Sequence, residues 1–304
     1  MKKTLTPIFC LLANLVFAQD DLLSSLEKET KEPTTYTIAT FKGTRLINGH
    51  SVETLKKKHM DYLISHRFGE FGDRFFYNFI GFDNANIRMA IEYGLTDNFT
   101  VGIGRNSVGK TYDYYGKYKL LRQSTGETSF PVTITAFGSA ATTTVDTSPS
   151  TVFNNNLDRQ SFTGQLLIAR KFDENLSLQI MPTFVHRNSV EAGDENNTIA
   201  MGVGGRYKLS KRISFNAEYY YVIRNINYAA LGMTPRYNAA SFGFDIETGG
   251  HVFQLHFTNT RTMIEKSFIP ETLGAGDTGL QNFHFGFNIS RVFSFDKRAK
   301  ETNK

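Results

Sequence analysis

One stretch near the end of the chain decides how the whole sequence is interpreted: Asn282 to Phe295, NFHFGFNISRVFSF. Its odd positions hold Phe or Ile, apart from Arg291, and its even positions hold mostly Asn, His, Gly or Ser. Since successive side chains of a strand point to opposite faces, the stretch predicts a strand with one apolar and one polar face. A strand of a soluble sandwich can have this pattern, whereas a strand of a membrane barrel must have it.

Bulk composition neither supports nor excludes a membrane barrel. The chain has 304 residues, of which 40% are hydrophobic and 21% charged, and its mean hydropathy is −0.31. Barrel strands alternate, so an averaged hydropathy does not reveal them. The formal net charge is +5. Because Lys and Arg are scattered over predicted strand ends and form no stripe, we expect no nucleic-acid partner.

The N-terminus has the features of an export signal. Lys2 and Lys3 precede an apolar region from Leu5 to Phe17, and Ala18 ends a small-residue cleavage motif. We therefore predict a signal peptide over residues 1–18, cleaved after Ala18. Its removal would take away Cys10, the one cysteine of the chain. A chain exported without disulfides can be held together by a closed, hydrogen-bonded barrel.

Alternation like that of the opening stretch recurs in twelve segments from Met60 onward, an even number. Short connections fall at 96–98, 124–127, 173–175, 210–212 and 248–250, and longer polar ones at 69–86, 106–110, 146–160, 188–197, 226–236 and 262–280. The two kinds alternate along the chain, which is typical of up-and-down barrels in the outer membrane. The sequence thus predicts an all-β fold, an up-and-down antiparallel transmembrane β-barrel of about 12 strands, surrounded by outer-membrane lipid.

Four parts of the chain follow from this interpretation. They are the signal peptide, a mobile periplasmic tail over 19–35, the outer-membrane barrel over 36–295, and a C-terminal tail over 296–304. Within the barrel region, residues 36–55 form either an extra strand or a segment folded into the lumen. Both chain ends are expected on the periplasmic side.

Several segments resemble those of a known family: RLINGHSVET at 45–54, ISHRFG at 64–69, PTFVHRN at 182–188, ETGGHVFQL at 247–255 and GFNISR at 286–291. They are similar to an outer-membrane β-barrel family of Gram-negative bacteria that is catalogued as a domain of unknown function. The resemblance covers nearly the whole mature chain. It implies the fold and the location, and it brings no activity and no catalytic residues.

Charged residues of polar parity are candidates for lining the lumen and selecting solutes: Arg67, Arg88, Glu92, Arg187, Arg206, Glu218, Arg224, Asp245 and His256. Arg105 and Arg261 have apolar parity near the outer loops and are candidates for binding outer-leaflet lipid, since Arg binds phosphate and carboxylate bidentately. Long cationic side chains also snorkel to any membrane interface without a ligand. Opposite charges such as Glu92 and an Arg either pair and fill the interior or line a small pore.

No motif in the sequence identifies an enzyme. The histidines lack ligand-like spacing, so we expect no metal and no cofactor, and no nucleophile elbow is present. The sequence favours a narrow channel or a binding protein for small anionic solutes. One alternative is a membrane-embedded hydrolase using His256 and Asp245. Another is an anchoring barrel with a sealed lumen, whose loops or tail recruit a partner. No feature of the sequence indicates the oligomeric state.

Overall fold

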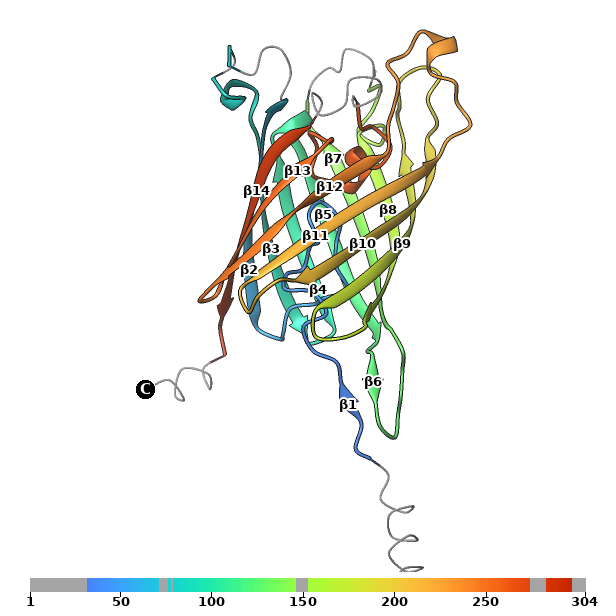
Figure 1. Cartoon of the computed structure of the whole chain (residues 1–304). Helices are drawn as coiled ribbons and strands as arrows, with labels where there is room; N and C mark the ends of the chain where they lie inside the picture. Colours follow the sequence, from blue (N-terminus) through green and yellow to red (C-terminus); the bar gives the residue numbers. More distant parts are fainter. Residues whose placement is uncertain (1–31, 71–75, 78, 146–152, 274–282, 297–304) are drawn as a thin grey trace, which may run out of the picture.

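In the computed structural model, twelve antiparallel strands close into a barrel (Figure 1). The structure describes residues 32–70, 76–77, 79–145, 153–273 and 283–296. The barrel strands, 8 to 12 residues long, are β2 (His59–Glu70), β3 (Asn86–Thr96), β4 (Phe99–Asn106), β5 (Thr111–Leu121), β7 (Thr133–Thr143), β8 (Gln160–Lys171), β9 (Leu176–Arg187), β10 (Asn197–Lys208), β11 (Ile213–Ile223), β12 (Ala239–Thr248), β13 (His251–Thr258) and β14 (His284–Ser294). The predicted fold and strand number are confirmed.

The opening stretch forms the strand that closes the barrel. β14 pairs with β2, the first barrel strand, with Phe287 opposite His66 and a register shift between His284 and Gly286. His284, Gly286 and Asn288 are buried inside the barrel, whereas the intervening Phe residues are part-exposed on its outer face. The alternation therefore predicts correctly which face of this strand is polar and enclosed.

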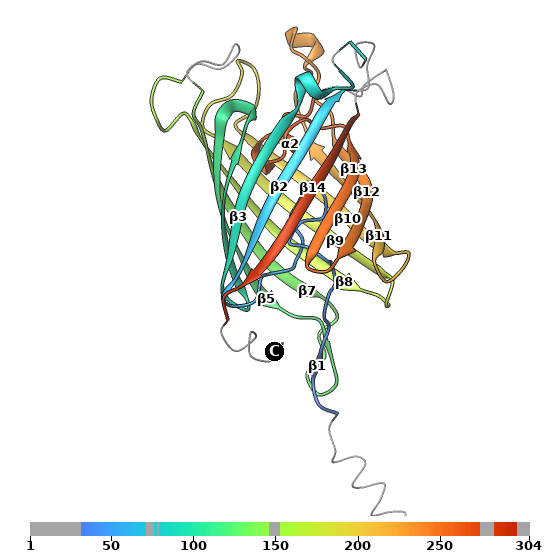
Figure 2. The same ribbon diagram turned by 90° about the vertical axis from the view of Figure 1, so that its left-hand side faces the viewer.

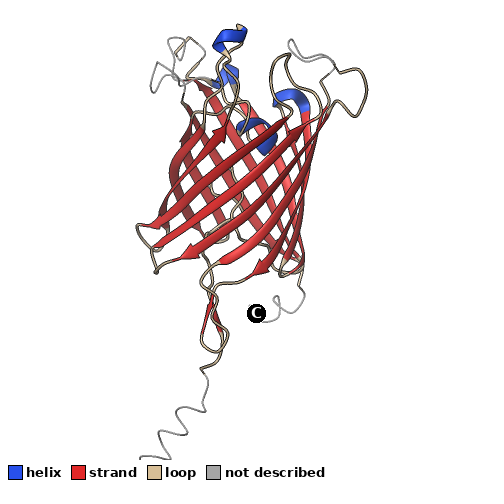
Figure 3. Cartoon of the chain, turned by 90° about the vertical axis from the view of Figure 1, so that its right-hand side faces the viewer, coloured by secondary structure: helices blue, strands red, loops and turns tan. Residues whose placement is uncertain are grey.

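Connections of different length gather at opposite ends of the barrel (Figure 3). One end, here called the turn end, has tight turns such as those between β3 and β4 and between β12 and β13. The other, the loop end, has the long connections and three short 3₁₀ helices, Phe82–Asn84, Val108–Lys110 and Ala229–Leu231. Two connections depart from the sorting by length: the turn-end link 122–132 is longer than the loop-end link 107–110.

The turn-end link 122–132 projects beyond the barrel and pairs with the start of the described chain. Its strand β6 (Ser124–Thr125) pairs with β1 (Thr35–Tyr36), and the Thr37 N–H donates to the Gln123 carbonyl at 2.8 Å. Figure 2 shows this two-stranded arm below the barrel. Residues 32–35, predicted as part of a mobile tail, are therefore anchored here, while 1–31 and 297–304 lie outside the described residues.

From β1 the chain enters the lumen from the turn end, turns back and leaves at β2 (Figures 1 and 2). We call residues 40–55 the plug. Its two arms are joined by backbone hydrogen bonds from Ser51 to Thr44 at 3.0 Å and from Leu46 to Gly49 at 2.8 Å. Of the two alternatives for 36–55, the structure thus shows residues 40–55 folded into the lumen, while Tyr36 belongs to β1 of the arm outside the barrel. None of the described helices is long and apolar enough to cross a membrane.

Candidate functional site

The barrel wall holds the plug by its backbone, and Glu218 on β11 supplies one set of these contacts. Its carboxylate accepts three successive plug N–H groups, from Ile47 at 3.3 Å, Asn48 at 2.8 Å and Gly49 at 3.1 Å. Glu218 lies at an inward position between Ala217 and Tyr219, as its parity predicts. Hydrogen bonds to an ionised acceptor are stronger than neutral ones, so this residue fixes residues 47–49, here called the tip of the plug.

On the opposite side of the plug, Lys117 of β5 binds carbonyl oxygens. Its Nζ donates to Thr44 at 3.0 Å, Ser51 at 3.4 Å and Glu53 at 2.6 Å. Three donors on one ammonium group therefore join both arms of the plug. Lys117 is fully buried, so these carbonyls replace the water that a lysine normally requires.

The side chain of Asn48 joins the plug to three strands of the wall. Arg67 donates to its Oδ1 at 2.7 Å, and its Nδ2 donates to Ser241 at 2.9 Å and Thr258 at 3.3 Å. These three partners come from β2, β12 and β13. Arg67 is thus placed inside the lumen, as predicted, where it binds the protein's own chain.

Close packing also fits the plug to the wall. A Cβ added to Gly49 would lie 2.0 Å from the hydroxyl oxygen of Tyr220 and 3.1 Å from its Cζ. Tyr220 is fully buried and belongs to the luminal apolar cluster, together with Leu46 and Val52 of the plug. The tip therefore accommodates only glycine at position 49.

Two predicted lumen charges, Arg88 and Glu92, each bind a partner within the wall. Arg88 on β3 reaches past β4 to Asp113 on β5, with Nε–Oδ1 at 3.1 Å and Nη2–Oδ2 at 2.5 Å. Gly104 of β4 provides the space for this side chain, since a Cβ there would lie 2.6 Å from the Arg88 Nη2 atom. Pairing with an Arg was one of the two alternatives for Glu92. Instead it accepts a hydrogen bond from the Tyr115 hydroxyl at 3.0 Å, because Asp113 already occupies Arg88.

Two further predicted residues bond to neighbouring wall or loop groups. Arg206 donates to Ser214 at 3.0 Å. Arg224, just past the end of β11, donates to Asn238 at 2.8 Å and to the Tyr237 carbonyl at 2.8 Å. These contacts position strand ends and loops, and neither side chain reaches the plug.

The residues named for a hydrolase do not form a catalytic pair. Asp245 lies opposite Gln254 in the register and accepts a hydrogen bond from it at 2.7 Å, while His256 lies opposite Gly243. The His256 and Asp245 side chains share no hydrogen bond, and both are buried. The described residues also contain no group of three or more His, Cys, Asp or Glu that could hold a metal ion.

A second segment covers the plug from the loop end. The loop between β13 and β14 folds into the barrel mouth as a short helix, α2 (Glu265–Phe268). Phe268 packs edge-on against Tyr220, with ring centroids 5.1 Å apart. Glu265 lies 3.5 Å from Arg45 and 3.6 Å from His50, both in the plug. The helix therefore links the mouth of the barrel to the plug.

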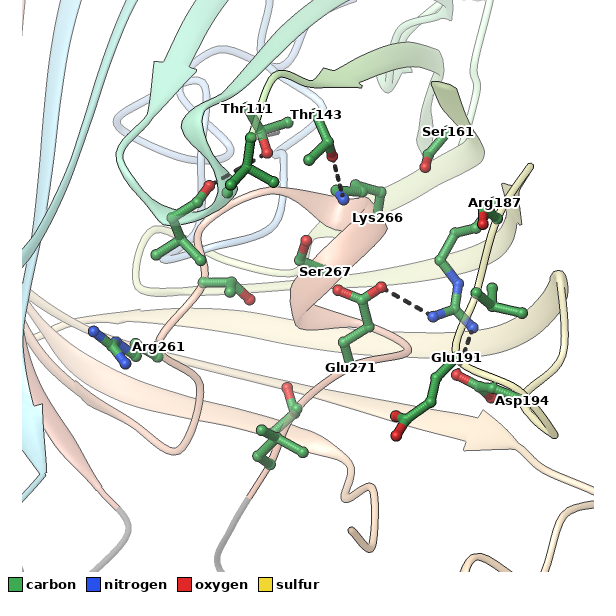
Figure 4. Close-up of a pocket in the computed structure, with 18 of the residues that line it drawn as sticks. Thr111, Thr143, Ser161, Arg187, Glu191, Asp194, Arg261, Lys266, Ser267 and Glu271 are labelled. Carbon is green, nitrogen blue, oxygen red and sulfur yellow. Dashed lines mark hydrogen bonds and ion pairs between the residues drawn. The ribbon is translucent and has the colours of Figure 1, made fainter. Parts of the chain in front are cut away.

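Above α2 lies a cavity of about 410 Å³ (Figure 4), here called the mouth cavity. Arg187, a predicted lumen residue, donates to Glu271 at 3.0 Å and to Asp194 at 3.2 Å. Tyr228 donates its hydroxyl to Asp194 at 3.0 Å, and burial followed by the charge of Asp194 raises its pKa, so it stays a donor. Lys266 of α2 donates to the Thr143 hydroxyl at 3.1 Å.

The two arginines named for lipid contact lie in different surroundings. Arg105 is exposed on the outer face of β4, with its guanidinium 5.6 Å from the centre of the Tyr112 ring. Arg261 is exposed as well, but it lines the mouth cavity (Figure 4). Lipid binding by either residue stays a prediction.

Several residues that hold the plug are absent from the sequence-based candidates, mainly because those candidates were chosen by charge. Four of them are uncharged and bond to the plug backbone. Gln179 bonds to His50 and Val52, Gln254 to Leu46, Asn288 to Ile47, and Thr135 to Val52. All four have the inward parity that the alternation identifies. What the sequence lacked was any sign that their partner is the chain itself.

A closed barrel with an apolar outer face and a polar, occupied interior is a membrane-bound β-barrel. The chain belongs to the family described as membrane bound beta barrel domain (DUF5777), which it matches over residues 41–293. The match includes the plug as well as the strands, and it confirms the resemblance found in the sequence. No curated protein matches the chain.

Among solved structures, the chain is similar to a structure titled NanC porin, with 11% identity, 78% of this chain and 99% of that chain covered, and a TM-score of 0.46. It is similar to a KdgM porin with 9% identity, coverage of 78% and 99%, and a TM-score of 0.43. A CymD monoaromatic hydrocarbon channel gives 9% identity, coverage of 79% and 89%, and a TM-score of 0.36. At these identities and TM-scores, the similarities carry no argument about function.

Proposed function

We propose that the protein is a narrow outer-membrane channel for small anionic solutes, closed in this structure by its own plug. The loop end faces the outside and the turn end faces the periplasm, following the expected arrangement of such barrels. The outer face of the wall contacts lipid, and the signal peptide predicted at residues 1–18 directs export.

The observation that carries the proposal is that the barrel closes without the plug. The twelve strands form an unbroken hydrogen-bonded ring, and residues 40–55 contribute no strand to it. Side chains such as Glu218 and Lys117 hold the plug by its backbone. These bonds can be exchanged for bonds to water while every strand pair stays intact. A segment bound in this way suits a gate better than a structural core.

The wall lining does not by itself favour one sign of solute charge. Among the described residues of the barrel strands, five cationic side chains are buried, Arg67, Arg88, Lys117, Arg187 and Arg206, and five carboxylates, Asp61, Glu92, Asp113, Glu218 and Asp245. The two sets balance. A preference for anions therefore has to come from the entrance at the loop end.

Electrical recording in planar bilayers tests this function. We expect the wild-type protein to be closed for most of the time and a variant with a displaced plug to give stable current steps. In a salt gradient, the reversal potential of the open variant reads its ion selectivity. Absence of steps from both proteins, at any salt concentration, would refute the channel.

A second candidate is an anchoring barrel whose lumen stays sealed. The observation in its favour is the arm formed by β1 and β6, which projects past the turn end and offers a surface to a periplasmic partner. This function predicts that displacing the plug yields no current, whereas removing the arm abolishes capture of the partner by the membrane-embedded protein.

A further inference from the structure

The cations that line the mouth cavity fall into two groups. Arg187 and Arg236 are neutralised, the first by Asp194 and Glu271 and the second by Glu191 at 2.8 Å. Lys266, Arg159 and Arg261 also line the cavity, but none of them has a carboxylate within ion-pair distance among the described residues. The remaining carboxylates of the lining, Glu70 and Asp158, form no ion pair with these three cations. Of these three cations, Lys266 and Arg159 both bind Thr143, so one part of the cavity holds two positive charges that no carboxylate of the described residues pairs.

These two cations converge on one strand end, the end of β7. Lys266 donates to the Thr143 hydroxyl at 3.1 Å, while Arg159 donates through Nη1 to the Thr143 carbonyl at 3.4 Å and the Val145 carbonyl at 2.5 Å. The guanidinium of Arg159 also lies 4.7 Å from the centre of the Phe153 ring. Both side chains are thus held in place by uncharged partners.

Both groups have donors beyond those used in these bonds. An ammonium group carries three N–H donors and a guanidinium group five. The bond from Lys266 uses one, and the bonds from Arg159 use one nitrogen of its fork. Lys266 and Arg159 are only half-buried, so the remaining donors are open to a solute in the cavity.

We propose that Lys266 and Arg159 form a binding site for one anionic oxygen group, a carboxylate or a phosphate, of a small solute. This inference rests on the proposed function and names the residues that recognise the solute at the entrance. The volume of about 410 Å³ lies within the range of small-molecule sites, about 300–1,000 Å³.

Carboxylates that line the cavity limit the solute further. Glu191, Asp194 and Glu271 are each already paired with an arginine. A second anionic group beside these pairs would meet carboxylates whose arginines are already neutralised, whereas a hydroxyl could donate to them. The solute therefore carries its anionic group at one end and neutral polar groups at the other.

The site also lies directly on the element that covers the plug. Lys266 follows Glu265 in the same short helix, and Glu265 points the other way, to Arg45 and His50. A solute held by Lys266 is thus bound to the helix that contacts the gate.

Equilibrium binding to the full-length protein in uncharged detergent tests the site, at constant ionic strength. The probes are gluconate, which has one carboxylate and several hydroxyls, inorganic phosphate, and uncharged sorbitol. We expect gluconate and phosphate to bind, and sorbitol to bind at least about 10-fold more weakly, since a hydrogen bond to a charged group is worth a factor of this size or more.

The variants are Lys266→Met and Arg159→Met, with Lys211→Met as the matched control. Lys211 is an exposed lysine in a turn at the far end of the barrel, so the control removes the same charge away from the cavity. We expect each cavity variant to weaken gluconate binding about 10-fold and the control to leave it unchanged. Lys266→Arg keeps the charge and should retain binding, which separates loss of the site from loss of folding.

Equal gluconate affinity in Lys266→Met and Lys211→Met would overturn the assignment, as would wild-type affinity no higher for gluconate than for sorbitol. Competition by added anionic lipid would assign the pair to a lipid headgroup and overturn the solute assignment. If gluconate binds but no variant ever conducts, the channel fails while the site stands. If a variant conducts but gluconate does not bind, the site fails alone.

Discussion

Replacing Gly49 by Val should open the barrel, because position 49 has no space for a side chain while the plug is docked. The first added carbon would lie 2.0 Å from the hydroxyl oxygen of Tyr220. Interiors are packed too tightly for a buried ring such as this one to move aside freely. The tip of the plug must therefore withdraw from the wall.

Withdrawal removes the bonds that the tip makes to Glu218, which lie between 2.8 and 3.3 Å. A hydrogen bond to a charged group contributes about 1.5–3 kcal/mol, so losing two of the three costs about 3–6 kcal/mol. Since about 1.4 kcal/mol corresponds to a factor of ten, the ratio of docked to undocked plug falls by about two to four orders of magnitude. A barrel that is closed nearly all the time becomes one that opens often.

Single-channel recording measures this change directly as open probability. The matched control is Gly43→Ala in the same plug, where an added Cβ would meet only the backbone of Arg45 at 3.7 and 3.9 Å, an ordinary contact. We expect frequent or sustained openings for Gly49→Val and wild-type behaviour for Gly43→Ala. If Gly49→Val stays as closed as the control while both fold, the plug is not held as the structure indicates.

Three further predictions concern other contacts. Glu218→Gln keeps the shape of the acceptor but replaces charge-assisted bonds by neutral ones. The open probability in the same single-channel recordings should therefore rise at least about 10-fold, without loss of barrel stability. Arg88→Met leaves Asp113 buried without its partner and should destabilise the barrel by about 3–5 kcal/mol in urea unfolding; replacing both residues by apolar ones should recover most of the loss. Gly126→Ala should release the β1 arm, because its φ is +95° and its Cβ would lie 2.5 Å from the Pro33 carbonyl oxygen, and limited proteolysis should then cut residues 32–39 faster while the barrel stays intact.

The barrel itself could be predicted from the sequence because its signal is local and repeated. In each strand, alternate side chains face lipid or the enclosed interior, so Phe285 and Phe287 on one side and Asn288 on the other suffice to orient the strand. The grouping of long and short connections then fixes the up-and-down order. Neither inference requires knowledge of which residues meet across the lumen.

From the sequence, a lumen segment within 36–55 is only one of two alternatives, and the contacts of this segment could not be predicted because they join residues far apart in the chain. Glu218 binds residues about 170 positions earlier, at 47–49, and no periodicity in the plug marks it as a partner. The Arg88–Asp113 pair skips a strand, which depends on the space above Gly104. The alternation along a strand thus predicts that a charged side chain lies inside the barrel. Which group it binds there depends on the strand register and on the path of the plug.

The central claim is that residues 40–55 fill the lumen and are bound there through their backbone. Amide hydrogen exchange at Ile47, Asn48 and Gly49 in the membrane-embedded protein tests it most directly, since protection reports the free energy of local opening. The structure predicts protection close to that of the barrel strands in the wild-type protein, lost in Gly49→Val. Exchange at these three amides as fast as in the exposed turn at Lys211 would contradict it.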